Sequence, residues 1–179
     1  MQYPTERVSV QDRIIQYATE TGWGYVKRSS AEKSRGFNTG QNLPREQAIH
    51  ASLFFDDILF EKVKEFNSKY EGTKDELVRT LSQLRSDISG NRVFLSYLRG
   101  EKTFHSSADN REYNLQLIDY KNQANNIYHV TDEYYYFNGH YANREDIVFL
   151  INGIPILVIE CKNATKDEAI AIGIDQLRR

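Results

Sequence analysis

The amino-terminal half of the chain carries apolar residues at helical spacing. Residues 9–21 open with Ser-x-x-Asp and repeat apolar side chains every three or four positions, which predicts a helix. A proline at a first-turn position predicts a long second helix over residues 44–66. Thr73 and Glu76 form a capping box that predicts the start of a third helix. A fourth is expected over residues 92–99.

The pattern then changes toward strands. Residues 100–110 are polar and predict a loop, whereas residues 113–120, 127–130 and 133–137 have the alternation or the aromatic content of strands. A second capping box at residues 165–168 predicts a final helix. Helices, then a mixed sheet, then a helix predict an α/β fold, a mixed central sheet flanked by helices in one domain over residues 1–179.

Charged residues interrupt the most apolar part of the sequence. Asp146 precedes two runs rich in Ile, Val, Leu and Phe, and Glu160 and Lys162 follow them. Asn152-Gly153 between the runs favours a hairpin turn. Because both runs are apolar on both faces, we expect buried strands, where an uncompensated charge costs several kcal/mol. The three charges therefore need a metal ion or a counter-ion.

The register of this hairpin decides whether the charges can meet. A two-residue turn pairs Asp146 with Ile159 and leaves Glu160 on the other face. A three-residue loop with a bulge at Gly153 pairs Asp146 with Glu160 instead. The spacing of the three charges therefore predicts a bulged hairpin, or else a bend at Asp146.

Two carboxylates and a lysine suit metal-dependent phosphodiester chemistry. Asp146 and Glu160 offer the hard oxygen ligands that Mg²⁺ prefers, and the Lys162 ammonium can reach a water or a phosphate. Cys161 is expected to be a small core residue. The alternative from the residues alone is a buried Glu160–Lys162 ion pair that only ends a strand.

Asp146 followed by Glu160-Cys161-Lys162 resembles the PD-(D/E)xK nuclease motif. The wider segment 144–162 resembles the amino-terminal domain of type I restriction enzyme restriction subunits, and Gly22-Trp23 and Asn125-Asn126 follow that family's order. The motif's proline is Glu145 here. The resemblance implies a restriction-endonuclease-like fold that cleaves double-stranded DNA with Mg²⁺.

The same resemblance implies a larger, ATP-dependent machine. A glutamine followed four residues later by tyrosine is expected after the Glu-x-Lys strand; Gln176 fits its first position, and the chain stops before the second. We therefore expect an amino-terminal fragment of a longer polypeptide with ATPase domains, working beside methyltransferase and specificity subunits. The segment itself has no phosphate-binding loop, so ATP belongs to the expected remainder.

Further residues are candidates of a second rank. Gln11 and Glu46 sit in first turns of predicted helices, where a polar site residue and a simple helix-start role are both open. Asp119 is expected to orient a loop, and Tyr134, Tyr135 and Tyr136 to form a sheet face rather than a base-stacking surface. A basic cluster predicted to lie in a loop could follow a DNA backbone. Its members are Lys27, Arg28, Lys33 and Arg35.

Composition bounds the class of protein. The net charge of -2 is unusual for a DNA-binding chain, so we expect the rest of the larger complex to provide most of the DNA binding. A single cysteine excludes an internal disulfide, and the chain has neither a secretory signal nor an apolar run of ~18 residues, so we expect a cytoplasmic protein without a membrane span. Two other functions stay open: a catalytically silent nuclease-fold module that docks DNA or partner subunits, and a stand-alone repair or junction nuclease.

Overall fold

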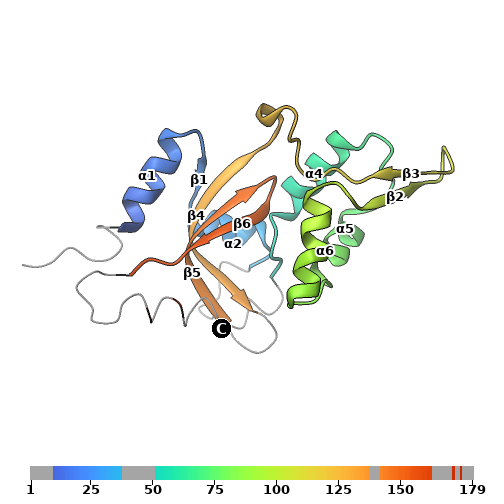
Figure 1. Cartoon of the computed structure of the whole chain (residues 1–179). Helices are drawn as coiled ribbons and strands as arrows, with labels where there is room; N and C mark the ends of the chain where they lie inside the picture. Colours follow the sequence, from blue (N-terminus) through green and yellow to red (C-terminus); the bar gives the residue numbers. More distant parts are fainter. Residues whose placement is uncertain (1–9, 38–50, 138–141, 163–170, 172–173, 175–179) are drawn as a thin grey trace, which may run out of the picture. The chain divides into compact units, whose positions relative to one another are not determined.

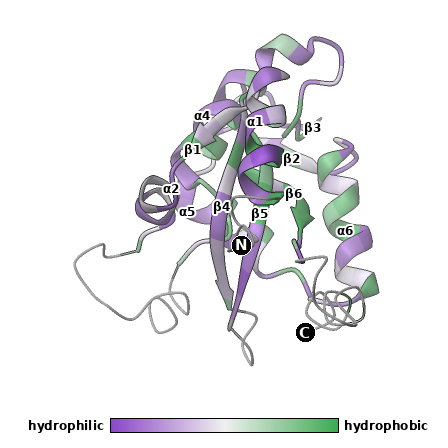
Figure 2. Ribbon diagram, turned by 90° about the vertical axis from the view of Figure 1, so that its left-hand side faces the viewer, coloured by the Kyte–Doolittle hydropathy of each residue, from purple (hydrophilic) through white to green (hydrophobic). Residues whose placement is uncertain are grey.

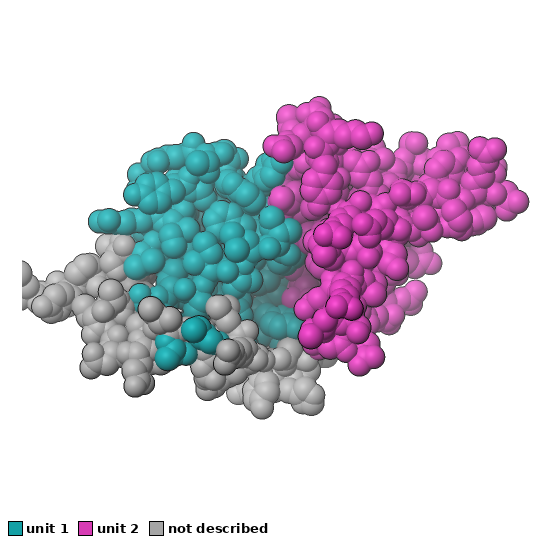
Figure 3. All heavy atoms as spheres, in the orientation of Figure 1, with its two compact units in different colours: residues 1–51, 128–150, 155–179 teal, residues 52–127, 151–154 magenta. Residues whose placement is uncertain are grey.

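A computed structural model describes residues 10–37, 51–137, 142–162, 171 and 174. The chain divides into two compact units that are discontinuous in sequence (Figure 3). Unit 1 comprises residues 1–51, 128–150 and 155–179, and unit 2 comprises residues 52–127 and 151–154.

A four-stranded sheet organises unit 1 (Figure 1). Its strand order is β1-β4-β5-β6, and β1 runs parallel to β4 with Tyr25 paired to Val130. The strands β5 and β6 are joined by a tight hairpin, so the sheet is mixed. Two helices, α1 and α2, accompany it. The bounds are α1 Asp12–Glu20, β1 Gly24–Val26, α2 Arg28–Ser34, β4 Tyr128–Phe137, β5 Ala142–Ile151 and β6 Ile154–Ile159.

The core of unit 1 forms between α1 and one face of this sheet. Ala18 of α1 packs with Val130, Ile147 and Phe149 of the strands, and Cys161 joins the same cluster. Figure 2 shows β6 as largely hydrophobic and β5 as hydrophilic in its first half and hydrophobic in its second, in agreement with where the apolar runs lie in the sequence. Cys161 is buried, as predicted for a small core residue.

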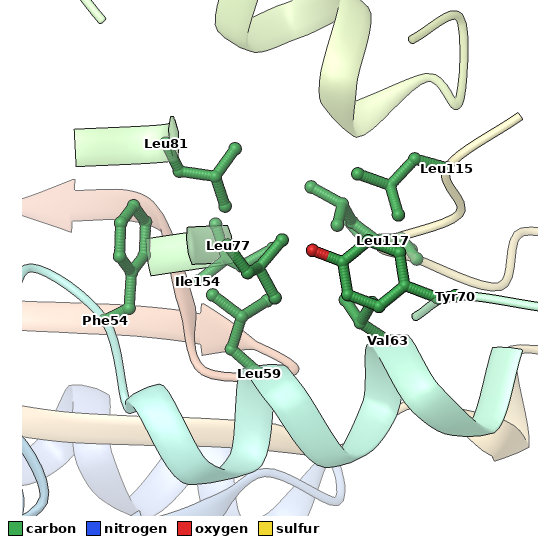
Figure 4. Packing of buried hydrophobic residues seen from close by; sticks show 10 residues of the cluster. Phe54, Leu59, Val63, Tyr70, Leu77, Leu81, Leu115, Leu117 and Ile154 are labelled. Carbon is green, nitrogen blue, oxygen red and sulfur yellow. The ribbon is translucent and has the colours of Figure 1, made fainter. Parts of the chain in front are cut away.

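Unit 2 packs helices around its own core (Figure 4). Leu59 and Val63 of α4 pack against Leu77 and Leu81 of α5 there. Leu117, in the segment after the strand that ends at residue 114, belongs to the same cluster. Thr73 accepts from the Glu76 N–H and the Glu76 side chain accepts from the Thr73 N–H, which confirms the predicted capping box. The bounds are α4 Asp56–Phe66, α5 Lys74–Ser82, α6 Ile88–Leu98, β2 Thr103–Ser106, β3 Arg111–Asn114 and a 3-10 helix, Gln123–Asn125.

The hairpin between β5 and β6 has a two-residue turn, so the predicted bulged loop is wrong. Asn152 and Gly153 both have positive φ, at 51° and 78°, which is the type I′ geometry that matches the twist of the strands. Asn152 is fully buried and tolerates this conformation because its side chain is held by hydrogen bonds. A Cβ at Gly153 would stand 2.6 Å from the Phe55 carbonyl oxygen. The backbone conformation and the surrounding contacts therefore favour asparagine at position 152 and glycine at position 153.

Other element predictions need correction. Residues 51–55 are not helical, and the helix α4 begins only at Asp56. The Ser52 hydroxyl accepts from the Phe54 N–H and donates to the Asp56 carboxylate just before this start. Residues 44–50 of the predicted helix lie outside the described part. Residues 103–106 form a strand where a loop was predicted. The predicted strand 113–120 ends at Asn114.

The sheet also departs from the predictions in two places. Residues 128–137 form one strand rather than two, with a positive φ of 54° at Glu133. The strand β6 is not buried on both faces, since Ile156, Leu157 and Val158 are exposed at the edge of the described sheet. The second capping box, at residues 165–168, lies outside the described residues.

Candidate functional site

Asp146, Glu160 and Lys162 come together at the end of the β5–β6 hairpin. Asp146 lies within β5 and is buried, and its Oδ2 accepts a hydrogen bond of 2.7 Å from the Cys161 N–H. The Lys162 Nζ contacts Oε1 of Glu160 directly. The side chains of Glu160 and Lys162 are 7% and 19% exposed. A buried ion pair therefore sits beside a buried carboxylate.

The three groups converge although the hairpin is not bulged. The strand β6 ends at Ile159, so Glu160 lies outside the strand. The alternation of side chains along a strand therefore does not determine the face toward which Glu160 points. The hydrogen bond from the Cys161 N–H draws this segment onto Asp146. The end of the strand thus does what a bulge was predicted to do.

Burial dominates the electrostatics of Glu160. It raises the pKa of this carboxyl above its ordinary value of 4.5; the hydrogen bond from Lys162 acts in the opposite direction, and the nearby Asp146 raises the pKa again. Two buried carboxylates close together with one lysine are a set that a bound cation would stabilise in its charged form.

Glu145 is a further carboxyl that interacts electrostatically with this site, and it was not among the residues predicted from the sequence. Burial raises its pKa, and Glu160 and then Asp146 raise it further. The only signal in the sequence was its place beside Asp146 in an apolar segment, where it occupies the position of the motif's proline.

Glu145→Gln is expected to stabilise the chain in EDTA at neutral pH. A folded-state pKa above 4.5 means that this carboxyl contributes stability below the unfolded pKa and that this stability is lost as the pH rises through the folded pKa. The glutamine variant lacks this loss, so its melting temperature should exceed that of the parent at pH 7 and not at pH 4. Thermal unfolding followed by circular dichroism measures both. A lower melting temperature of the variant at pH 7, or the same difference in melting temperature at pH 7 and pH 4, would contradict a raised pKa of Glu145.

Gln11 is buried at the start of α1, and its Oε1 has no hydrogen-bond partner among the described residues. The neighbouring Val10 packs on the cluster that contains Cys161 and Ile159, at the segment that leads into the carboxylates. A buried acceptor without a partner costs about 1–3 kcal/mol. The structure therefore distinguishes Gln11 from an ordinary helix-start residue.

The basic cluster is arranged differently from the prediction, because most of it forms the helix α2 rather than a loop. Lys27 and Lys33 are exposed, and Arg28 pairs with Glu32 at 2.7 Å. Arg35 is buried: it donates to the Tyr135 carbonyl at 2.6 Å and lies 3.7 Å from the centroid of the Tyr134 ring. The guanidinium of Arg35 is thus buried and contacts groups of the protein itself rather than solvent.

Two other predictions concern structure. Asp119 accepts from the backbone N–H groups of Lys121 and Asn122 and from the Asn125 side chain, so it orients a loop as predicted. Tyr134 is buried in the sheet, as expected of an aromatic strand. Glu46 and Gln176 lie outside the described residues and stay predictions.

A family comparison identifies the chain. The model of the type I restriction enzyme R protein N terminus matches residues 3–179. The chain belongs to this family.

Two relatives from Methanocaldococcus jannaschii agree with this result. A putative type I restriction enzyme MjaVIIP endonuclease subunit is 34% identical over 86 residues, 48% of this chain and 8% of the relative. A putative type I restriction enzyme MjaVIIIP endonuclease subunit is 30% identical over 130 residues, 68% of this chain and 12% of the relative. The matched region thus spans about a tenth of the length of these curated relatives. In the described part of the chain, no helix has the length and apolar character needed to cross a membrane.

Proposed function

We propose that the chain is the DNA-cleaving part of a type I restriction enzyme and that Asp146, Glu160 and Lys162 are its catalytic residues. The observation that carries the proposal is the convergence of these three side chains in one buried place, in a chain whose relatives are named endonuclease subunits. The fold would then be of the restriction-endonuclease type, and the substrate double-stranded DNA.

The donor set fits Mg²⁺. No group of three or more His, Cys, Asp or Glu side chains suited to a metal occurs in the described ranges, and Mg²⁺ needs only one or two protein carboxylates, with water and substrate phosphate completing its ligands. Asp146 and Glu160 would hold the ion. When bound, Mg²⁺ supplies charge for the phosphate oxygens and lowers the pKa of a coordinated water.

The residues of the chain have separable tasks. The Cys161 N–H donates to one oxygen of Asp146 and so fixes the orientation of this carboxylate. Lys162 is held by Glu160 and would stabilise negative charge on the scissile phosphate or orient the attacking water. Gln11 would act as an accessory acceptor at the same site, since its buried Oε1 has no partner in the described residues.

The remaining functions of the enzyme would lie outside this region. ATP-driven translocation would belong to the rest of the polypeptide, and methyltransferase and specificity subunits would supply target recognition. No base-reading helix is evident in the sequence. The chain would cut DNA that the larger complex delivers.

Binding of Mn²⁺ to the chain tests the metal site without requiring the complex. Electron paramagnetic resonance should show saturable binding to the parent chain and its loss in Asp146→Ala. Asp75→Ala, which removes an acid from the first turn of α5, is the matched control and should bind as the parent does. Equal binding by the parent and Asp146→Ala would contradict the metal site, and no binding by the parent would favour a silent docking module.

A further inference from the structure

A cavity of about 610 Å³ lies in unit 1, between the end of β1, the helix α2 and the strand β4. None of its lining residues belongs to the Asp146 site. The wall combines an aromatic ring, two cations and three carboxylates, contributed by Tyr25, Lys27, Arg28, Glu32, Asp132 and Glu133.

A distortion of β4 creates one side of this cavity. Neighbouring residues of a regular strand point to opposite faces, yet Asp132 and Glu133 both line the cavity. Glu133 has a φ of 54°, which is uncommon for a residue with a Cβ and re-aims its side chain. Two adjacent carboxylates therefore reach the same space.

The charges in the cavity are ordered by depth. Asp132 is 2% exposed and accepts from the Tyr25 hydroxyl at 2.8 Å, so it forms part of the floor. Lys27 is exposed and has no ion-pair partner within the described ranges, so its ammonium stands at the rim. The other two acids already have cationic partners, Glu32 with Arg28 and Glu133 with Arg144.

We propose that this cavity binds one unpaired nucleotide of the DNA substrate, an inference that rests on the proposed nuclease function. The exposed ammonium of Lys27 suits a phosphate at the rim, and the Tyr25 ring, 38% exposed, offers a surface on which a base can stack. Carboxylates accept hydrogen bonds from amino groups, and each oxygen can accept more than one. The floor therefore favours cytosine, adenine or guanine over thymine, which has no amino group.

The cavity is linked to the cutting site through the sheet. Glu133 lines it, and its carboxylate pairs with Arg144 at 2.8 Å. Arg144 precedes Asp146 by two positions on β5, a step of roughly 7 Å along a strand. The strands β4 and β5 therefore connect the cavity to the Asp146 site through the Glu133–Arg144 ion pair.

Fluorescence anisotropy with short labelled oligonucleotides tests the proposal. Titrations of the chain in EDTA at one fixed salt concentration exclude cleavage and keep the phosphate contribution constant. Tyr25→Leu and Lys27→Ala should each weaken binding of oligo(dC) about tenfold. The parent should bind oligo(dC) more tightly than oligo(dT) or a duplex of equal length.

Matched controls separate this site from general basicity and from the cutting site. Tyr17→Leu removes a 62% exposed tyrosine of α1, and Lys33→Ala removes an exposed lysine of α2 outside the cavity; both should leave binding unchanged. Asp146→Ala should also bind oligo(dC) normally, so a failed cutting site would not imitate a failed cavity. Equal losses in Lys27→Ala and Lys33→Ala, or no preference for oligo(dC) over oligo(dT), would overturn the proposal.

Discussion

Lys162→Ala is expected to reduce Mg²⁺-dependent DNA cleavage by the complete assembled enzyme about 10²- to 10⁴-fold. The Lys162 ammonium is largely buried and touches the Glu160 carboxylate, so it is positioned next to the groups that would hold the ion. A positioned cation in such a place stabilises developing charge far better than one in water, because the surrounding dielectric is low. Alanine removes this charge without introducing a new contact.

Cleavage of closed-circular DNA carrying the recognition site, followed over time on a gel, measures the effect. Lys74→Ala is the matched control, since it removes a 43% exposed lysine from a surface ion pair with Asp57. Its cleavage should equal that of the parent. Unchanged cleavage by Lys162→Ala would refute the role of this residue.

Asn152→Ala is expected to lower the free energy of unfolding by about 2–5 kcal/mol. Asn152 is 0% exposed, and its Oδ1 accepts from the Ile127 N–H at 2.8 Å. Its Nδ2 donates to the Leu117 carbonyl and to Asn126, each at 2.9 Å. Alanine would leave buried polar groups without partners and would place a residue with no local hydrogen bond at positive φ.

Urea unfolding of the two chains measures this loss. Asn122→Ala is the control, because Asn122 precedes the 3-10 helix and its exposed side chain makes a single bond of 3.2 Å to Asn125. That variant should stay within about 0.5 kcal/mol of the parent. A loss of similar size in both variants would mean that the buried network around Asn152 has no special weight.

The candidate site was accessible from the sequence because its signal is local and costly. Charged residues within an apolar segment need a physical reason, and this requirement singled out Asp146, Glu160 and Lys162. The predicted register of the hairpin was wrong because the ladder does not extend to Glu160: β6 ends one residue earlier, and the Cys161 N–H donates to Asp146. Where a strand ends depends on tertiary hydrogen bonds that a periodicity does not contain.

The helices and strands also differ in how well the sequence predicted them, depending on whether local or tertiary contacts determine them. The capping box at Thr73 and the apolar stripe of α1 act within a few residues, and the sequence predicted both. The β2–β3 hairpin was missed because its strands are mostly polar, and Phe104 and Tyr113 are the cross-strand pair that is aromatic. The cavity beside α2 was missed as well, since it depends on the positive φ of Glu133 and on a contact between Tyr25 and Asp132 far apart in sequence.

Cleavage by a combined variant tests most directly whether the three residues form one catalytic unit. Groups that act together lose their effect together, so Asp146→Asn with Lys162→Ala in the assembled enzyme should cleave DNA about as slowly as the more impaired single variant. Losses that multiply, or a double variant that cleaves at the parent's rate, would contradict a shared nuclease site at the end of the β5–β6 hairpin.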